Sequence, residues 1–179
     1  MTPVSRDPLL DAAAALADVS AADALGGWSP PGIPVSTGAI ILDDAGDLLI
    51  LKPTYKTGWT IPGGIMEADG ESPWDACRRE VLEETALVVE TGRLVCVDTR
   101  PGTATRTLGL RLLFHCGVLT QQQKGSIRVQ REEVSQFRFV PAEDAFALLR
   151  GPIRRRVRAG LAGSGCRYLE NGRPVSGVR

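Results

Sequence analysis

A glycine-rich loop that leads into an acidic helix, over residues 63–87, most constrains the fold of this chain. Ser72 is a suitable N-cap, because its hydroxyl can accept a hydrogen bond from a free amide of the first helical turn. Trp74, Cys77 and Val81 recur at steps of three and four residues and therefore share one apolar face. The stretch predicts an amphipathic helix that packs this face against a sheet.

Three glutamates lie close together on this predicted helix. Glu83 and Glu84 follow Glu80 by three and four residues, so the three side chains fall within an arc of roughly 100°. Like charges at this spacing repel each other, and a hard divalent cation that prefers oxygen ligands would remove the repulsion. Taken alone, the glutamates favour a solvated acidic face paired with Arg78 and Arg79. The flanking residues change that interpretation.

Those flanking residues resemble the signature of the Nudix hydrolase superfamily, G-x5-E-x7-R-E-U-x-E-E-x-G-U, in which U is aliphatic. The resemblance runs from Gly64 to Leu87. From Glu71 onward the chain follows the signature through the residues Arg79, Glu80, Val81, Glu83, Glu84 and Leu87. Six residues instead of five separate Gly64 from Glu71, and Ala86 stands in place of the last glycine. Glycine there would suit a left-handed helix terminus, so the alanine leaves the shape of the helix end open.

The resemblance covers about residues 35–150 and implies an α/β fold, namely a Nudix-like α/β/α sandwich with a mixed β-sheet. The apolar patterns agree with a sheet covered by helices on both faces. Strands are predicted over residues 37–42, 48–52, 59–62, 93–99, 108–119 and 134–140, and helices over residues 142–149 and 152–161.

Three segments are expected along the chain. Residues 1–34 are predicted to form an alanine-rich helical arm that ends in a proline- and glycine-rich linker. Residues 35–160 would form the Nudix hydrolase domain, and residues 161–179 an irregular C-terminal tail. A homodimer is common in the superfamily and is a further expectation, with the arm as a candidate contact between subunits.

The resemblance assigns a metal site to the box. Glu83 and Glu84 would be the core metal ligands, assisted by Glu80. A backbone carbonyl at Gly63 would complete the site. The expected cofactor is Mg²⁺ or Mn²⁺, because both ions prefer oxygen ligands.

Further residues are expected to take part in catalysis together with Glu80. Arg79 would orient the glutamates through an ion pair, with Glu71 as its candidate partner. The superfamily often takes another carboxylate from a later loop as a metal ligand or general base. Glu132 and Glu133 precede the predicted strand 134–140, and Glu133 is preferred for this role.

Specificity for the substrate is expected to lie in loops outside the box, over residues 53–58, 100–107 and 121–125. The aromatic and basic side chains of the first two loops give the substrate-binding candidates Tyr55, Lys56, Arg100 and Arg106. A second basic cluster comprises Arg154, Arg155, Arg156 and Arg158. Its first interpretation is an exposed helix face, and contact with phosphate or nucleic acid is the alternative.

The resemblance implies a magnesium-dependent pyrophosphohydrolase that cleaves a diphosphate bond in a nucleoside diphosphate linked to another moiety. A metal ion can neutralise phosphate oxygens and lower the pKa of a bound water. Two alternatives stay open: a Nudix-like domain that senses a nucleotide without turnover, and a hydrolase of a non-nucleotide diphosphate such as a prenyl diphosphate. Retention of all the box glutamates favours catalysis over sensing.

The amino-acid composition limits the classes of binding partner that we expect. Lys and Arg together number 21, as do Asp and Glu, so no overall charge favours nucleic acid or a membrane surface. The chain lacks an 18-residue apolar run and a secretion signal, and we expect a soluble cytoplasmic protein. Its four cysteines are scattered, which favours reduced thiols over disulfides or a zinc site. The partner that the family resemblance implies is a small-molecule diphosphate.

Overall fold

The computed structural model describes residues 32–178, in which seven strands form one sheet in the order β5-β2-β1-β4-β3-β6-β7. The strands are β1 (Val35–Leu42), β2 (Leu48–Pro53), β3 (Arg93–Arg100), β4 (Gly109–Val118), β5 (Val134–Val140), β6 (Arg167–Glu170) and β7 (Arg173–Pro174). The helices are α2 (Pro73–Thr85), α3 (Gln121–Ser126), α4 (Ala142–Leu148) and α5 (Gly151–Leu161). The arm predicted within residues 1–34 lies outside the described residues, except for its last three.

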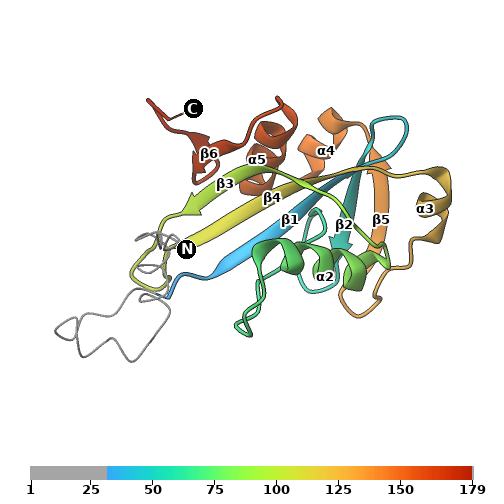
Figure 1. Cartoon of the computed structure of the whole chain (residues 1–179), viewed down its shortest axis with the longest axis horizontal. Coiled ribbons are helices and arrows are strands. Elements are labelled where there is room, and N and C mark those ends of the chain that lie inside the picture. The colour runs from blue at the N-terminus through green and yellow to red at the C-terminus, as the bar shows by residue number, and fades with distance from the viewer. Residues whose placement is uncertain (1–31, 179) are drawn as a thin grey trace, which may run out of the picture. The chain divides into compact units, whose positions relative to one another are not determined.

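The sheet is mixed and has helices on both faces, as the sequence predicted. β1 pairs in parallel with β4, and β3 with β6, whereas the other neighbouring strands are antiparallel. Figure 1 shows α2 on one face of the sheet and α4 with α5 on the other. The predicted α/β/α sandwich is therefore confirmed. No helix among residues 32–178 is long and apolar enough to cross a membrane.

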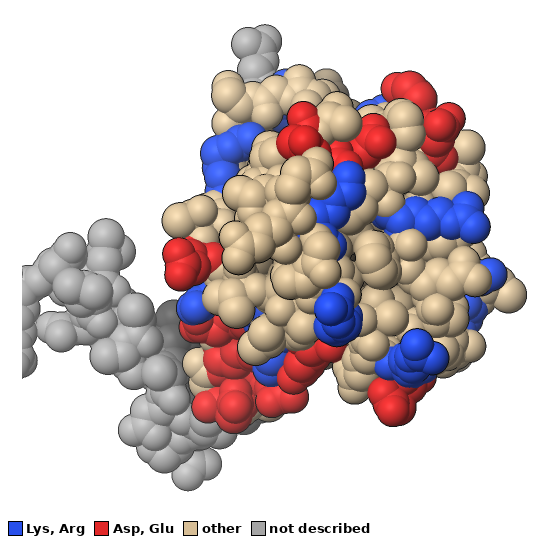
Figure 2. Space-filling model, turned by 90° about the vertical axis from the view of Figure 1, so that its right-hand side faces the viewer, with Lys and Arg blue, Asp and Glu red and all other residues tan. Residues whose placement is uncertain are grey.

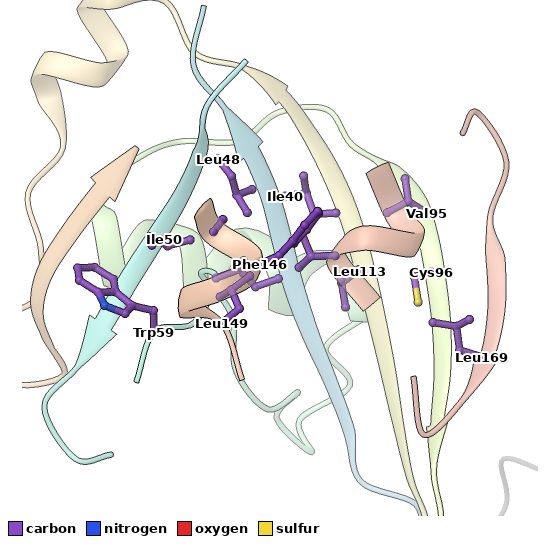
Figure 3. Close-up of a cluster of buried hydrophobic side chains, with 13 residues drawn as sticks. Ile40, Leu48, Ile50, Trp59, Val95, Cys96, Leu113, Phe146, Leu149 and Leu169 are labelled. Carbon is purple, nitrogen blue, oxygen red and sulfur yellow. The ribbon is translucent and has the colours of Figure 1, made fainter. Parts of the chain in front are cut away.

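Strand β1 contributes side chains to two apolar cores, because successive side chains of a strand point to opposite faces of the sheet. Ile40 packs in the cluster under α4 and α5, which also holds Phe146 and Val157. Figure 3 shows this cluster, with side chains from the strands converging on the two helices. Ile41 instead packs on the α2 side. A strand buried on both faces explains the continuous apolar run in this part of the sequence.

Helix α2 begins and ends as its sequence indicates. Ser72 is the N-cap, and its hydroxyl accepts a hydrogen bond of 3.1 Å from the amide of Asp75. Ala86 adopts the left-handed conformation, with φ of 60°, and its amide donates to the carbonyl of Leu82 at 2.8 Å. The helix therefore ends in the conformation that the signature's glycine would favour, although an alanine occupies the position.

The C-terminal residues differ from the irregular tail that was predicted. Residues 167–170 form β6 and pair in parallel with β3, and Leu169 is buried in the core under α5. Asn171 and Gly172 both have positive φ and connect β6 to β7. Consecutive Asn and Gly are a strong signal for a hairpin, so the sequence did contain an indication of this turn. The short β6 forms because the edge of β3 supplies its hydrogen bonds.

Two shorter segments also differ from the sequence prediction. Residues 121–125 were expected to be a loop but lie in α3, where Thr120 and Gln123 form a capping box. Residues 59–62 were expected to be a strand but form only isolated bridges, such as that of Thr60 with Leu51. Pro62 lacks an amide donor, which limits strand pairing there.

Candidate active site

Arg79 holds the acidic residues of the box together. Its guanidinium donates to both carboxylate oxygens of Glu71, with Nε–Oε1 and Nη2–Oε2 distances of 2.8 and 3.2 Å. Its Nη1 donates to Glu80 and to Glu83, each at 3.1 Å. Hydrogen bonds from Arg79 lower the pKa of Glu71 and raise that of the arginine, so both stay ionised. The ion pair suggested by the sequence is thus present, and it extends to two more glutamates.

Glu84 points from the same helix into the interior, beside the glycine loop. Its side chain is 5% exposed and accepts a hydrogen bond of 2.8 Å from the amide of Gly63. Burial raises the pKa of Glu84 to about 7, against the lowering effect of the Gly63 amide, and the charges of Glu80 and Glu133 raise it further. Such a carboxyl is poorly stabilised as an anion until a cation approaches.

Glu80 has a similar environment. Burial raises its pKa, Arg79 opposes this, and the charges of Glu83 and Glu133 add to the rise. The charge of Glu133 therefore acts on the box glutamates, although the residue lies about fifty positions later in the chain, just before β5. Its carbonyl accepts from the amide of Thr54 at 2.8 Å, which fixes the backbone of this segment against the end of β2.

The paired glycines allow the loop to approach these carboxylates. Gly63 has φ of 138°, and a Cβ there would overlap the carbonyl of Thr37 on β1. A Cβ at Gly64 would overlap the carboxylate of Glu80. A larger residue at Gly63 would therefore displace the loop from β1, and one at Gly64 would displace the carboxylate of Glu80.

The carboxylates of Glu80, Glu83 and Glu84 are the type of ligand that a hard divalent cation prefers. Their oxygens, however, are not arranged around one point. Among residues 32–178, no three His, Cys, Asp or Glu side chains lie close enough to hold a metal ion as they stand. Glu80 and Glu83 are bonded to Arg79, whereas Glu84 is bonded to Gly63. All the donors are oxygens, and burial, with mutual repulsion as a smaller cause, raises the pKa of the two inner carboxylates. Arg79 contacts Oε1 of Glu80 and Oε2 of Glu83, so each of these carboxylates keeps one oxygen that does not contact the arginine.

A cavity of about 310 Å³ opens beside the glycine loop. Of the substrate-binding candidates, Tyr55 and Lys56 line it, and the charge of Lys56 also lowers the pKa of Glu84. Arg100 and Arg106 do not line it. Arg100 ends β3 and is half-buried, whereas Arg106 belongs to an exposed loop and donates to the carbonyl of Pro101 at 3.3 Å.

The other cavity residues were not predicted as substrate-binding. They include Thr37 of β1, whose buried hydroxyl has no hydrogen-bond partner within residues 32–178. They also include Arg111 of β4 and Arg156 of α5. A charged residue inside the apolar run of β4 was the available signal for Arg111. Arg156 belongs to the basic cluster whose contact with phosphate the sequence left as an alternative.

A glutamate cluster that an arginine holds on a helix, set beside a cavity whose mixed lining includes basic side chains, fits a cation-dependent hydrolase of phosphate compounds. The chain belongs to the Nudix hydrolase family, because the model of the NUDIX domain matches residues 32–159. Enzymes of this family act on pyrophosphate bonds and typically depend on a divalent metal.

Three known proteins illustrate the similarity. A MutT-like protein of Streptomyces ambofaciens is 38% identical over 88 residues, which are 49% of this chain and 54% of that protein, so the chain matches about half of that relative's length. A UDP-X diphosphatase structure gives a TM-score of 0.60 at 16% identity, covering 93% of this chain and 89% of that one. The NUDIX domain of Shewanella oneidensis NrtR, crystallised with ADP ribose, gives 0.56 at 17% identity, covering 72% and 87%. The two structures support the fold.

Proposed function

We propose that the protein is a magnesium-dependent pyrophosphohydrolase that cleaves the diphosphate of a nucleoside diphosphate linked to another group. The main support is the position of Glu84. This buried carboxyl has a raised pKa and contacts Gly63, which lines the cavity. A diphosphate in this cavity would lie next to the box glutamates, with Lys56 available to bind a phosphate oxygen.

The proposed roles follow from the contacts. Glu80, Glu83 and Glu84 would hold Mg²⁺, which supplies charge neutralisation of the diphosphate and lowers the pKa of water. Arg79 would position Glu80 and Glu83, and Glu71 would hold Arg79 in place. Glu133 is exposed, and its charge acts on Glu80 and Glu84, so it is the proposed acceptor of a proton from the attacking water.

Three basic side chains of the cavity favour a nucleotide over a prenyl diphosphate, although Ile61, Leu113 and Ile153 also line it. Lys56, Arg111 and Arg156 would lose hydration against a hydrocarbon chain, whereas they can bind the polar and anionic groups of a nucleotide. A nucleic-acid substrate receives no support from the surface in Figure 2, the side of β5 and α3, where basic and acidic side chains are interspersed. A small nucleotide is therefore the proposed substrate.

Product release from a panel of nucleoside diphosphate compounds tests this proposal, with magnesium and with a chelator. We expect magnesium-dependent cleavage of one class of compound. Glu83→Gln should lower kcat by at least about a hundredfold, because it removes a charged metal ligand. Glu83 is exposed, so this change should leave the fold intact. The matched control Glu90→Gln alters an exposed glutamate beyond the end of α2 and should keep full activity.

Turnover that survives in Glu83→Gln would show that the metal site is misplaced. Nucleotide binding by the native protein without turnover of any compound would favour the sensing domain instead.

A further inference from the structure

Arg111 lies at the cavity wall next to α5, and Arg100 lies beside it on the neighbouring strand, outside the cavity lining. The register of β3 and β4 pairs Asp98 with Arg111 and Arg100 with Gly109, so all four residues share one face of the sheet. Arg111 and Arg100 are diagonal neighbours on that face, a spacing that long side chains can bridge. A Cβ placed on Gly109 would lie 3.1 Å from Nη1 of Arg111 and 3.4 Å from Nη2. The Arg111 guanidinium therefore leans over Gly109, towards Arg100.

Asp98 is the acidic residue beside these arginines, and it neutralises the charge of only one of the three, Arg156. Asp98 is fully buried and accepts hydrogen bonds from Nε of Arg156 at 2.6 Å and from the amide of Gly172 at 2.7 Å. Its charge is thus taken up by Arg156.

Arg111 and Arg100 have no such partner. Arg111 donates to the carbonyl of Leu110 at 2.6 Å, and Nε of Arg100 is buried without a hydrogen-bond partner. Within residues 32–178, neither arginine forms an ion pair. Two half-buried positive charges therefore remain uncompensated.

This uncompensated charge is unfavourable without an anion. Burial lowers the pKa of Arg111, and the charges of Arg100 and Arg156 lower it further, with Asp98 opposing them. An anion bound between the guanidinium groups would relieve both the repulsion and the unmet hydrogen bonds. Arg111 lines the same cavity as Gly63 and Lys56, so a single ligand can contact both Arg111 and the glycine loop, and Arg100 lies next to Arg111.

We propose that Arg111 and Arg100, with Arg156 beside them, form a subsite for a second phosphate group, a monoester separate from the diphosphate that is cleaved. Two uncompensated guanidinium charges match the charge of a phosphate monoester, and the planar fork of each guanidinium suits its oxygens. The preferred substrates would then be diphosphates that carry an additional phosphate. This subsite rests on the proposed function, because it takes the cleaved diphosphate to lie at Gly63 and Gly64.

Two pairs of compounds test the subsite by turnover. NADP differs from NAD, and coenzyme A from dephospho-coenzyme A, by one phosphate monoester on an otherwise identical diphosphate. We expect kcat/KM to be about tenfold or more higher for the phosphorylated member of at least one pair. Arg111→Gln should abolish this preference. Arg93→Gln, at the opposite and exposed end of β3, should keep it.

A binding measurement separates this inference from hydrolysis. Adenosine 2′,5′-bisphosphate, adenosine 3′,5′-bisphosphate and AMP contain no diphosphate, so their affinities do not depend on turnover. We expect at least one bisphosphate to bind about tenfold more tightly than AMP, and Arg111→Gln to remove the difference. Thermal unfolding of the variant checks that it folds. If it does not fold, the affinities of the native protein for the bisphosphates and for AMP decide whether the subsite exists.

The outcomes distinguish the two proposals. Equal affinities, together with equal turnover of both members of each pair, would overturn the subsite and leave the hydrolase standing. Phosphate-dependent binding without turnover of any diphosphate would support the subsite and overturn the hydrolase. Absence of both phosphate-dependent binding and turnover would overturn both.

Discussion

Ala86 ends α2 in a conformation that alanine adopts at a cost. Its φ of 60° brings Cβ close to the following carbonyl, a strain of about 1–2 kcal/mol that glycine does not have. We therefore expect Ala86→Gly to raise the free energy of unfolding by about 1 kcal/mol, as measured by urea denaturation. Ala162 is the matched control, because it ends α5 with φ of −76°, where glycine brings no relief. Equal effects of glycine at the two positions would contradict this account.

Single residues differed in how well the sequence predicted their surroundings. The contact of Arg79 with Glu83 follows from helical spacing, which places residues four apart on one face, whereas its contact with the adjacent Glu80 does not. Arg111 could be seen as a charge inside an apolar strand. Its surroundings depend on pairing between β3 and β4 and on the position of α5, which no local pattern specifies.

An ion pair joins α3 to the turn between β1 and β2. Asp43 is 2% exposed and accepts hydrogen bonds from Lys124 and from the amides of Ala45 and Asp47. Burial raises the pKa of Asp43, but the hydrogen bond from Lys124 and that from Asp47 outweigh it, so the net pKa lies below its ordinary value. The contact therefore stabilises the fold above about pH 4 and is lost as the pH falls through the lowered pKa.

Asp43→Asn should accordingly lower the free energy of unfolding by about 1–3 kcal/mol at pH 7, because it leaves Lys124 without its partner charge. The difference from the native protein should shrink as the pH falls below about 4. Urea denaturation between pH 7 and pH 3 measures both effects. Glu90→Gln alters an exposed glutamate outside this turn and α3 and should change little. If the difference in free energy of unfolding between the variant and the native protein stays constant down to pH 3, the charge of Asp43 is not the cause of that difference.

At the scale of elements, the sequence predicted those with long apolar patterns and missed those that depend on partners. α2 and β1 have such patterns, and both formed where expected. β6 has only four residues and forms because β3 offers an unpaired edge. Its core residue Leu169 gave no periodic signal within so short a segment.

Across the whole molecule, the sheet separates the proposed chemistry from the proposed recognition. The box glutamates come from α2 on one face, whereas Arg111 and Arg156 belong to the face covered by α5. The cavity is lined both by the glycine loop, which contacts Glu80 and Glu84, and by the two arginines. The superfamily resemblance could predict the first region, since its signature covers α2. It could not predict the second, because the residues there come from separate strands and a helix outside the signature.

Magnesium should stabilise the whole fold if the box glutamates hold it. A ligand that binds only the folded state, at a hundred times its dissociation constant, adds about 2.7 kcal/mol, or roughly 5–10 °C in Tm for a chain of this size. Thermal unfolding with MgCl₂, against NaCl of equal ionic strength, measures this shift without any substrate. Glu84→Gln should abolish the shift, because it replaces a charged ligand with a neutral amide, and Glu90→Gln should retain it. An equal shift in Glu84→Gln would place the magnesium elsewhere, since a cation held at the box depends on that carboxylate.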